Sequence, residues 1–135
     1  MTEYGKRAGE LFAEGYNCAQ AVACAFAEHF NLPLDTLAAL ACPFGGGIAG
    51  MRNTCGTVSG MIAVIGLAKG NTEPGAKEKK LAAYALAREA IEEFEAANGS
   101  TICRELLLMQ KEGLHKKRSC RELCSLAADI AAKYI

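Results

Sequence analysis

Apolar residues recur at intervals of three and four along most of this chain, and segments that alternate strictly between apolar and polar residues are absent. A period of this length is typical of amphipathic α-helices. Asn17 and Ser119 are suitable N-cap residues, Pro33 can begin a helix, and Gly15 and Gly99 can end one. With these start and stop signals, the pattern predicts helices at residues 2–14, 18–30, 34–42, 55–68, 76–97, 103–110 and 120–134.

The predicted helix at 55–68 is apolar on almost every side, so we expect it to be the buried centre of a bundle. Gly56 and Gly60 would let a neighbouring helix approach it closely, within the chain or from another subunit. Apolar positions on two other helices should face inward, namely Leu37, Leu40, Leu81, Tyr84, Ala87, Ile91 and Phe94. The predicted fold class is all-α, a single domain over residues 1–135 with six or seven helices around the central one.

The composition narrows the class of protein. The chain has 135 residues, 51% hydrophobic and 22% charged, which suffices for one domain with a real core and excludes intrinsic disorder. Basic and acidic residues balance at 15 each, which argues against nucleic acid or an anionic membrane as a partner. The longest apolar run, 58–68, is too short to span a bilayer. No apolar segment precedes Glu10, so no secretory signal is visible and we expect a cytoplasmic location.

Seven cysteines are therefore the main chemical feature of the chain. The reducing cytosol does not normally support structural disulfides, and an odd number cannot pair fully within one chain. Some of the thiols should be free, metal-bound or redox-active. The competing interpretation is that Cys serves as a small hydrophobic residue in an Ala-rich core.

Predicted N-cap residues sort the thiols into two sets. Asn17, Thr54, Ser100 with Thr101, and Ser119 precede helices, so four cysteines should lie in first turns: Cys18, Cys55, Cys103 and Cys120. There the helix dipole favours thiolate and can lower the pKa of a thiol by about one to one and a half units at most. Cys24, Cys42 and Cys124 lie elsewhere on helices, and we expect Cys124 to be a core residue.

Helix dipoles of this size could not hold four neighbouring thiolates together against their repulsion. If the four converge, either pairs of them oxidise to disulfides or a cation neutralises them, as a [2Fe–2S] cluster or, with less support, Zn²⁺ would. No C-x-x-C motif is present to distinguish these outcomes.

A glycine-rich segment precedes Cys55 and is expected to be a loop. Gly45, Gly46, Gly47 and Arg52 are candidate cofactor-binding residues, because bare backbone N–H groups can form a nest for an anion or for cluster sulfides. A structural role in positioning cysteines is favoured over nucleotide binding, because neither nucleotide-binding glycine motif occurs.

Charged residues near the cysteines have candidate roles as well. Arg52 could support a thiolate at Cys55, and Lys116, Lys117 and Arg118 could do so at Cys120. The two histidines, His29 and His115, are isolated in the sequence and are expected at the surface.

Four segments resemble the motifs of a known family, the redox-active proteins named for the cysteine pattern C, GCAxxG, C, C. They are YNCAQAV (16–22), FGGGIAGMRNTCGTVSGMIAVIGL (44–67), NGSTICRELL (98–107) and SCRELCSLAA (119–128). These segments contain the same four cysteines that the capping pattern selects. The chain departs from the family at Thr57, where Ala is usual, and its hydroxyl could add a hydrogen bond beside Cys55. The resemblance implies an all-helical domain with a redox role.

Three hypotheses follow from these residues. The first is a thiol/disulfide oxidoreductase in which Cys18, Cys55, Cys103 and Cys120 exchange electrons with a partner protein, with Cys55 as the attacking sulfur. The second is an electron-transfer metalloprotein that ligates an iron–sulfur cluster, or zinc, through the same four residues. The third is a helical interaction module whose thiols only pack. A homo-oligomer is compatible with each of them.

Overall fold

The computed structural model describes residues 1–113 and 118–135. The described part is all-α, as predicted, with seven α-helices and two short 3₁₀ turns. The α-helices are α1 (Glu3–Ala13), α2 (Cys18–Cys24), α3 (Leu34–Ala41), α4 (Gly56–Lys69), α5 (Lys77–Asn98), α6 (Cys103–Glu112) and α7 (Cys120–Ala131). The 3₁₀ turns are η1 (Cys42–Phe44) and η2 (Ala132–Tyr134). Within the described ranges, no helix is long and apolar enough to cross a membrane.

Local capping explains where several helices begin. The Asn17 side chain accepts from the N–H of Gln20 at 2.9 Å, and the Gln20 side chain accepts in return from the N–H of Asn17 at 3.0 Å. Ser119 and Glu122 form the same reciprocal pair at the start of α7. Each pair satisfies donors that would otherwise be unpaired in a first helical turn. The capping prediction is therefore confirmed for Cys18 and Cys120, which are the first residues of α2 and α7.

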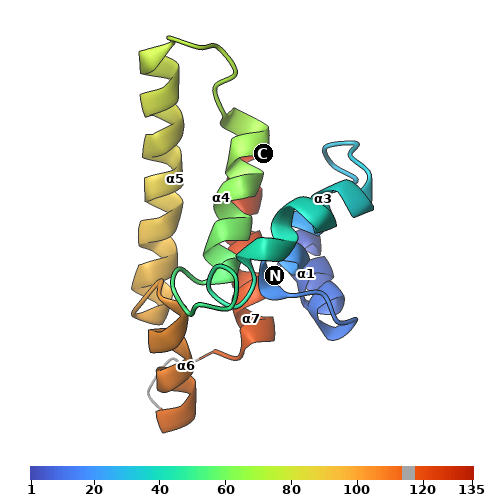
Figure 1. The fold of residues 1–135 in the computed structure, drawn as a ribbon, viewed down its shortest axis with the longest axis vertical. Coiled ribbons are helices and arrows are strands. Elements are labelled where there is room, and N and C mark those ends of the chain that lie inside the picture. The colour runs from blue at the N-terminus through green and yellow to red at the C-terminus, as the bar shows by residue number, and fades with distance from the viewer. Residues whose placement is uncertain (114–117) are drawn as a thin grey trace.

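The helices assemble around α4, which packs against α2, α5 and α7, while α1 packs against α7 and α2 (Figure 1). The largest fully buried side chains are Phe26, Phe94, Leu11, Met61, Ile65 and Ile130. Two glycines allow α4 to approach α2. A Cβ at Gly60 would lie 2.8 Å from the carbonyl oxygen of Ala19, and one at Gly56 would lie 2.4 Å from the sulfur of Cys18. Both glycines thus serve a contact within the chain.

The second helix is shorter than predicted, because it ends at Cys24 and not near residue 30. The backbone then tightens, with the N–H of Phe26 bonded to the carbonyl of Ala23 and that of Ala27 to Cys24. This turn brings the ring of Phe26 flat against that of Tyr4, with ring centres 4.4 Å apart, and the phenylalanine is fully buried. Stacking with α1 therefore outweighs continuation of the helical pattern.

The prediction of a wholly buried central helix is wrong on one side of α4. Ala63, Gly66 and Leu67 are exposed there. Leu40 and Tyr84, expected to point inward, are 63% and 55% exposed, and Leu81 is also exposed. Leu37 and Phe94 are buried as predicted, and Ala87 and Ile91 are half-buried. The open side arises because α3 and the first half of α5 stand apart from this face of α4, as the groove lined by all three helices shows.

Substitution of Gly56 by Ala should destabilise the protein, because the new methyl group would clash with the Cys18 sulfur and with the Phe44 carbonyl. We expect a loss of about 1–3 kcal/mol in the free energy of unfolding, measured by chemical denaturation. Gly66→Ala is the matched control in the same helix, since a Cβ there meets nothing within 4 Å. It should stabilise the helix by about 0.5–1 kcal/mol. Equal effects of the two substitutions would contradict the close packing of α2 on α4.

Candidate functional site

The four predicted cysteines lie at one end of the bundle, around the start of α4. Cys18 begins α2, and its sulfur fits in the space that Gly56 leaves open. Cys120 begins α7, and the electrostatic neighbours that act on its thiol are Cys18, Cys103 and Arg52. Cys18 is also an electrostatic neighbour of Cys55. The structure thus brings together thiols from four segments that are distant in sequence.

A short backbone ladder positions Cys55 and Cys103, and the prediction for their helix starts needs correction. Thr54 and Ile102 form an antiparallel β-bridge, flanked by bonds from Cys55 N–H to the Thr101 carbonyl (2.8 Å) and from Cys103 N–H to the Asn53 carbonyl (2.6 Å). This pairing holds residues 54 and 102 extended, so Thr54 does not cap α4.

Cys55 itself is the N-cap residue of α4, and Ile102 is that of α6. Ser100, which was expected to cap α6, accepts from the N–H of Ile102 and donates to the Glu105 carboxylate. Cys103 is the first residue of α6, in the first turn as predicted.

The glycine-rich loop folds back on itself before it reaches Cys55. The N–H groups of residues 48–53 donate to carbonyls within residues 43–48, including Asn53 to Gly47 at 2.8 Å. These N–H groups are therefore engaged within the loop. Of the glycines predicted to form an anion nest, Gly45 donates its N–H to the Cys42 carbonyl at 3.2 Å, and the nest at Gly46 and Gly47 stays a prediction. Ile48, Ala49 and Arg52 all have positive φ, a conformation that is unfavourable for residues with side chains.

Two loop glycines leave room for parts of the cysteine site. A Cβ at Gly45 would lie 2.4 Å from the Asn17 side chain, which caps the helix of Cys18. A Cβ at Gly47 would lie 2.7 Å from the Cβ of Cys103. The contacts at Gly45 and Gly47 fit the expected cysteine-positioning role of the loop. Gly46 turns against Gly50 within the loop.

Arg52 contacts a different thiol from the one expected. Its Nη1 atom donates to the sulfur of Cys103 at 3.7 Å, and its charge also acts on Cys120. The backbone at Arg52 is left-handed, with φ of 61°. A side chain on a left-handed residue points in a different direction from one on a helical or extended residue, so the sequence spacing to Cys55 did not predict the contact. An anionic sulfur accepts such a bond more strongly than a neutral thiol does.

For two of the four thiols, burial raises the pKa, whereas the helix termini were expected to lower it. It raises the pKa of Cys55, an effect that the 3.0 Å hydrogen bond with the Thr57 hydroxyl partly offsets. Burial likewise raises the pKa of Cys120, with hydrogen bonding from Gln110 acting in the opposite sense. Desolvation disfavours the charged form and here exceeds the helix dipole. The hydrogen bond expected from Thr57 is confirmed.

Cys124 is a fifth thiol of this cluster, which sequence analysis assigned to the core alone. It is fully buried, its sulfur lies 3.9 Å from the Cys18 carbonyl oxygen, and burial raises its pKa strongly. Charges on Cys18, Cys55 and Cys120 raise that pKa further. The position one turn after Cys120 was the available signal, because residues four apart share a helix face.

The other predicted residues lie outside the cluster. Cys24 is buried near the Leu34 carbonyl, Cys42 is exposed at the end of α3, and His29 is exposed beside Tyr4. The Arg118 guanidinium donates to Ala97 and Asn98, which ties the start of α7 to the end of α5. His115, Lys116 and Lys117 lie outside the described residues.

A protein holds a metal ion through several ligand atoms at bonding distance from it. In the described ranges, no three His, Cys, Asp or Glu side chains are placed so that they could share one metal ion. The arrangement of thiols described here therefore does not form a ready ligand set for a single metal ion such as zinc.

Comparison with known proteins gives a family match over most of the chain. Residues 16–134 match the family described as "Putative redox-active protein (C_GCAxxG_C_C)". The chain belongs to this family. An uncharacterized protein of Archaeoglobus fulgidus is similar over 133 aligned residues, with 29% identity, covering 93% of this chain and 88% of the relative. No solved structure gives a significant match. Family membership thus supplies the redox class and leaves the electron chemistry open.

The raised pKa of Cys124 predicts a loss of stability at alkaline pH. A thiol whose pKa is higher in the folded than in the unfolded protein stabilises the fold fully below the unfolded value, near 8.5. That contribution declines as pH rises from there toward the folded pKa. The unfolding free energy of the reduced protein should therefore fall between about pH 8.5 and 10. In Cys124→Ala this fall should be shallower, whereas Cys42→Ala should match the native protein. Parallel curves for all three proteins would contradict the burial of Cys124.

Proposed function

We propose that this protein exchanges electrons with a partner by reversible oxidation of two thiols of the cluster formed by Cys18, Cys55, Cys103 and Cys120. The observation that carries the proposal is the position of Cys18, which lies beside Cys55 and Cys120 at the start of α4, while Cys103 is a neighbour of Cys120. Arg52 donates to the Cys103 sulfur and its charge acts on Cys120, so a guanidinium lies beside two of these thiols. Membership in a redox-active family supports the same reaction class.

Cys18 is the best candidate for the attacking sulfur. It is only half-buried, it lies in the first turn of a capped helix, and it is an electrostatic neighbour of Cys55, Cys120 and Cys124. Cys55 was the sequence-based choice, but it is 6% exposed and burial raises its pKa. A buried, protonated thiol suits the resolving role better, because it reacts only after a mixed disulfide has formed beside it.

The reaction can be written as exchange with a disulfide of a partner protein. The Cys18 thiolate attacks one sulfur of that disulfide, the partner's S–S bond breaks, and one partner thiolate leaves. Cys120 or Cys55 then loses its proton and attacks the Cys18 sulfur of the mixed disulfide, which releases the second partner thiolate. The partner gains two electrons, this chain gains one disulfide, and the two protons from its thiols balance the two partner thiolates.

Removal of Cys18 should abolish this chemistry. Native protein, purified without oxygen and then equilibrated in glutathione or dithiothreitol redox buffers, should lose two alkylatable thiols in a single two-electron step. Cys18→Ser should lose none through an internal disulfide, while Cys42→Ser, which alters an exposed thiol at the end of α3, should behave as the native protein does. Alkylation followed by peptide mass mapping measures both the count and the pair.

Three results of this experiment would contradict the proposal. The first is a two-electron step that persists in Cys18→Ser. The second is stoichiometric iron and sulfide, or zinc, in the native protein purified without oxygen, which would favour the metalloprotein hypothesis. Unchanged thiols at every potential would favour packing only.

Arg52 should raise the reduction potential, because its charge favours the thiolate of Cys120 in the reduced form and has no anionic sulfur to stabilise in a disulfide. The guanidinium is exposed, so its contribution is small, about 0.5–1 kcal/mol. Arg52→Gln should therefore lower the midpoint potential by about 10–20 mV. Arg88→Gln, an exposed charge on α5, should leave the potential unchanged. An unchanged or higher potential in Arg52→Gln would contradict a role for Arg52 beside the thiols.

A further inference from the structure

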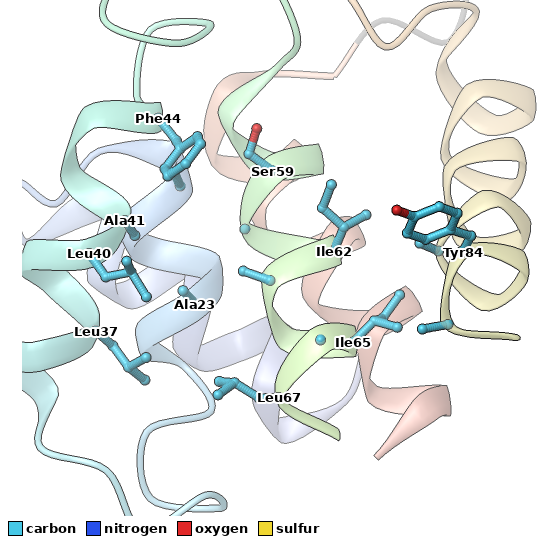
Figure 2. A pocket seen from close by; sticks show the side chains of 16 residues that line it. Ala23, Leu37, Leu40, Ala41, Phe44, Ser59, Ile62, Ile65, Leu67 and Tyr84 are labelled. Carbon is cyan, nitrogen blue, oxygen red and sulfur yellow. The ribbon is translucent and has the colours of Figure 1, made fainter. Parts of the chain in front are cut away.

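A broad apolar groove runs along the open side of α4, away from the thiols. Its floor is formed by small residues of α4, namely Ser59, Ala63 and Gly66, and its two walls are α3 and α5 (Figure 2). The groove has a volume of about 580 Å³, and none of its lining side chains is charged. A Cβ on Gly66 would meet nothing within 4 Å, so the floor is open to a neighbouring element.

Large apolar side chains stand along this groove and beside it, in contact with solvent. Leu40 and Phe44 lie on the α3 side, Leu67 lies on α4, and Leu81 and Tyr84 lie on α5, each 42–63% exposed. Together they expose about 500 Å² of mainly apolar surface. A patch of this size is comparable to the largest apolar patch on a typical monomer, and such patches are often functional. A stable protein interface buries roughly 800 Å² per partner, so a partner that covers this patch must also contact the surface beyond it.

We propose that a second copy of this chain covers the groove, in a two-fold symmetric dimer. In a two-fold symmetric interface the same patch of both copies is in contact, so it must carry both projections and hollows. The projections of each copy then fill the hollows of the other. This patch has both: Leu40, Leu67 and Tyr84 project at the margins, and the small residues of α4 leave a hollow between them.

The charges on α5 specify how the copies are oriented. Lys77 and Lys80 lie at the start of α5, Glu92 and Glu95 lie near its end, and all four are exposed. By helical spacing Lys77, Lys80 and Glu95 share the stripe that contains Tyr84, which lines the groove, and Glu92 lies at the edge of that stripe. The exposed Arg88 lies on the same stripe, where it would face Tyr84 of the other copy. Two antiparallel α5 helices that cross near Leu86 would bring Lys77 opposite Glu95 and Lys80 opposite Glu92 of the other copy. The dimer axis is therefore perpendicular to α5.

Other occupants fit the groove less well. A charged small molecule would find no charged side chain in the lining. A basic or acidic partner protein would not match a patch whose centre is apolar and whose two ends carry opposite charge. A second copy of this chain presents the same apolar centre with a basic end and an acidic end, so in the antiparallel orientation opposite charges face each other.

Light scattering after size exclusion tests the dimer directly. At about 50 µM the native protein should have twice the mass of one chain. Leu67→Glu should be monomeric at that concentration, because a carboxylate would be buried in the contact. Leu108→Glu is the matched control, since Leu108 is an exposed leucine on α6 outside the groove. It should remain dimeric, and circular dichroism should show that both variants are folded.

Two results would overturn the proposal. One is a native protein that is monomeric at 50 µM, with or without a co-purified apolar ligand. The other is equal masses for the two glutamate variants. Because Leu67→Glu could fail to fold, charge exchange provides a second test. Lys77→Glu with Lys80→Glu should raise the dissociation constant about 10-fold, and so should Glu92→Lys with Glu95→Lys. All four changes together should restore the native value to within about 3-fold. A further weakening in the quadruple variant would overturn the antiparallel arrangement.

Discussion

The arrangement of the thiols depends on the close contact between the starts of α2 and α4. A side chain at position 56 would occupy the place of the Cys18 sulfur, so Gly56 is what allows the two helix ends to meet. The capping box at Asn17 then fixes the first turn of α2, and a Cβ at Gly45 would displace the capping side chain. Three local features of sequence, a cap and two glycines, thus place one sulfur against the next helix.

Cys55 and Cys103 are held by a different device, a single β-bridge in a helical protein. The bridge uses the N–H groups of both cysteines, so the backbone at each is tied to the other segment. Helix α6 begins immediately after Ile102, and its position therefore follows from the loop that precedes α4. The loop before α4 contains four glycines, and its backbone is strained at Ile48 and Arg52, where φ is positive. Hydrogen bonds within residues 43–53 hold the loop in this conformation.

Sequence analysis could predict the helices, apart from the early end of α2, and the first-turn positions of Cys18 and Cys120, because these depend on local signals. The caps at Asn17 and Ser119 identify Cys18 and Cys120 without any tertiary information. The partner of Arg52 could not be predicted, because a positive φ at a non-glycine residue is set by surrounding contacts. The exposure of Leu40 and Tyr84 could not be predicted either. Apolar spacing shows that a face avoids water, and it does not show whether the same chain or another one covers that face.

Burial also resolves the electrostatic difficulty of gathering so many thiols. Several adjacent thiolates would repel each other, and helix ends are too weak to hold them. Burial raises the pKa of Cys55, Cys120 and Cys124 and so favours their neutral thiol form, which lowers the repulsion within the cluster. A negative charge that forms on any one of these sulfurs raises the pKa of its neighbours. The proposed sequential exchange, in which one thiolate attacks before the next thiol loses its proton, is consistent with these interactions.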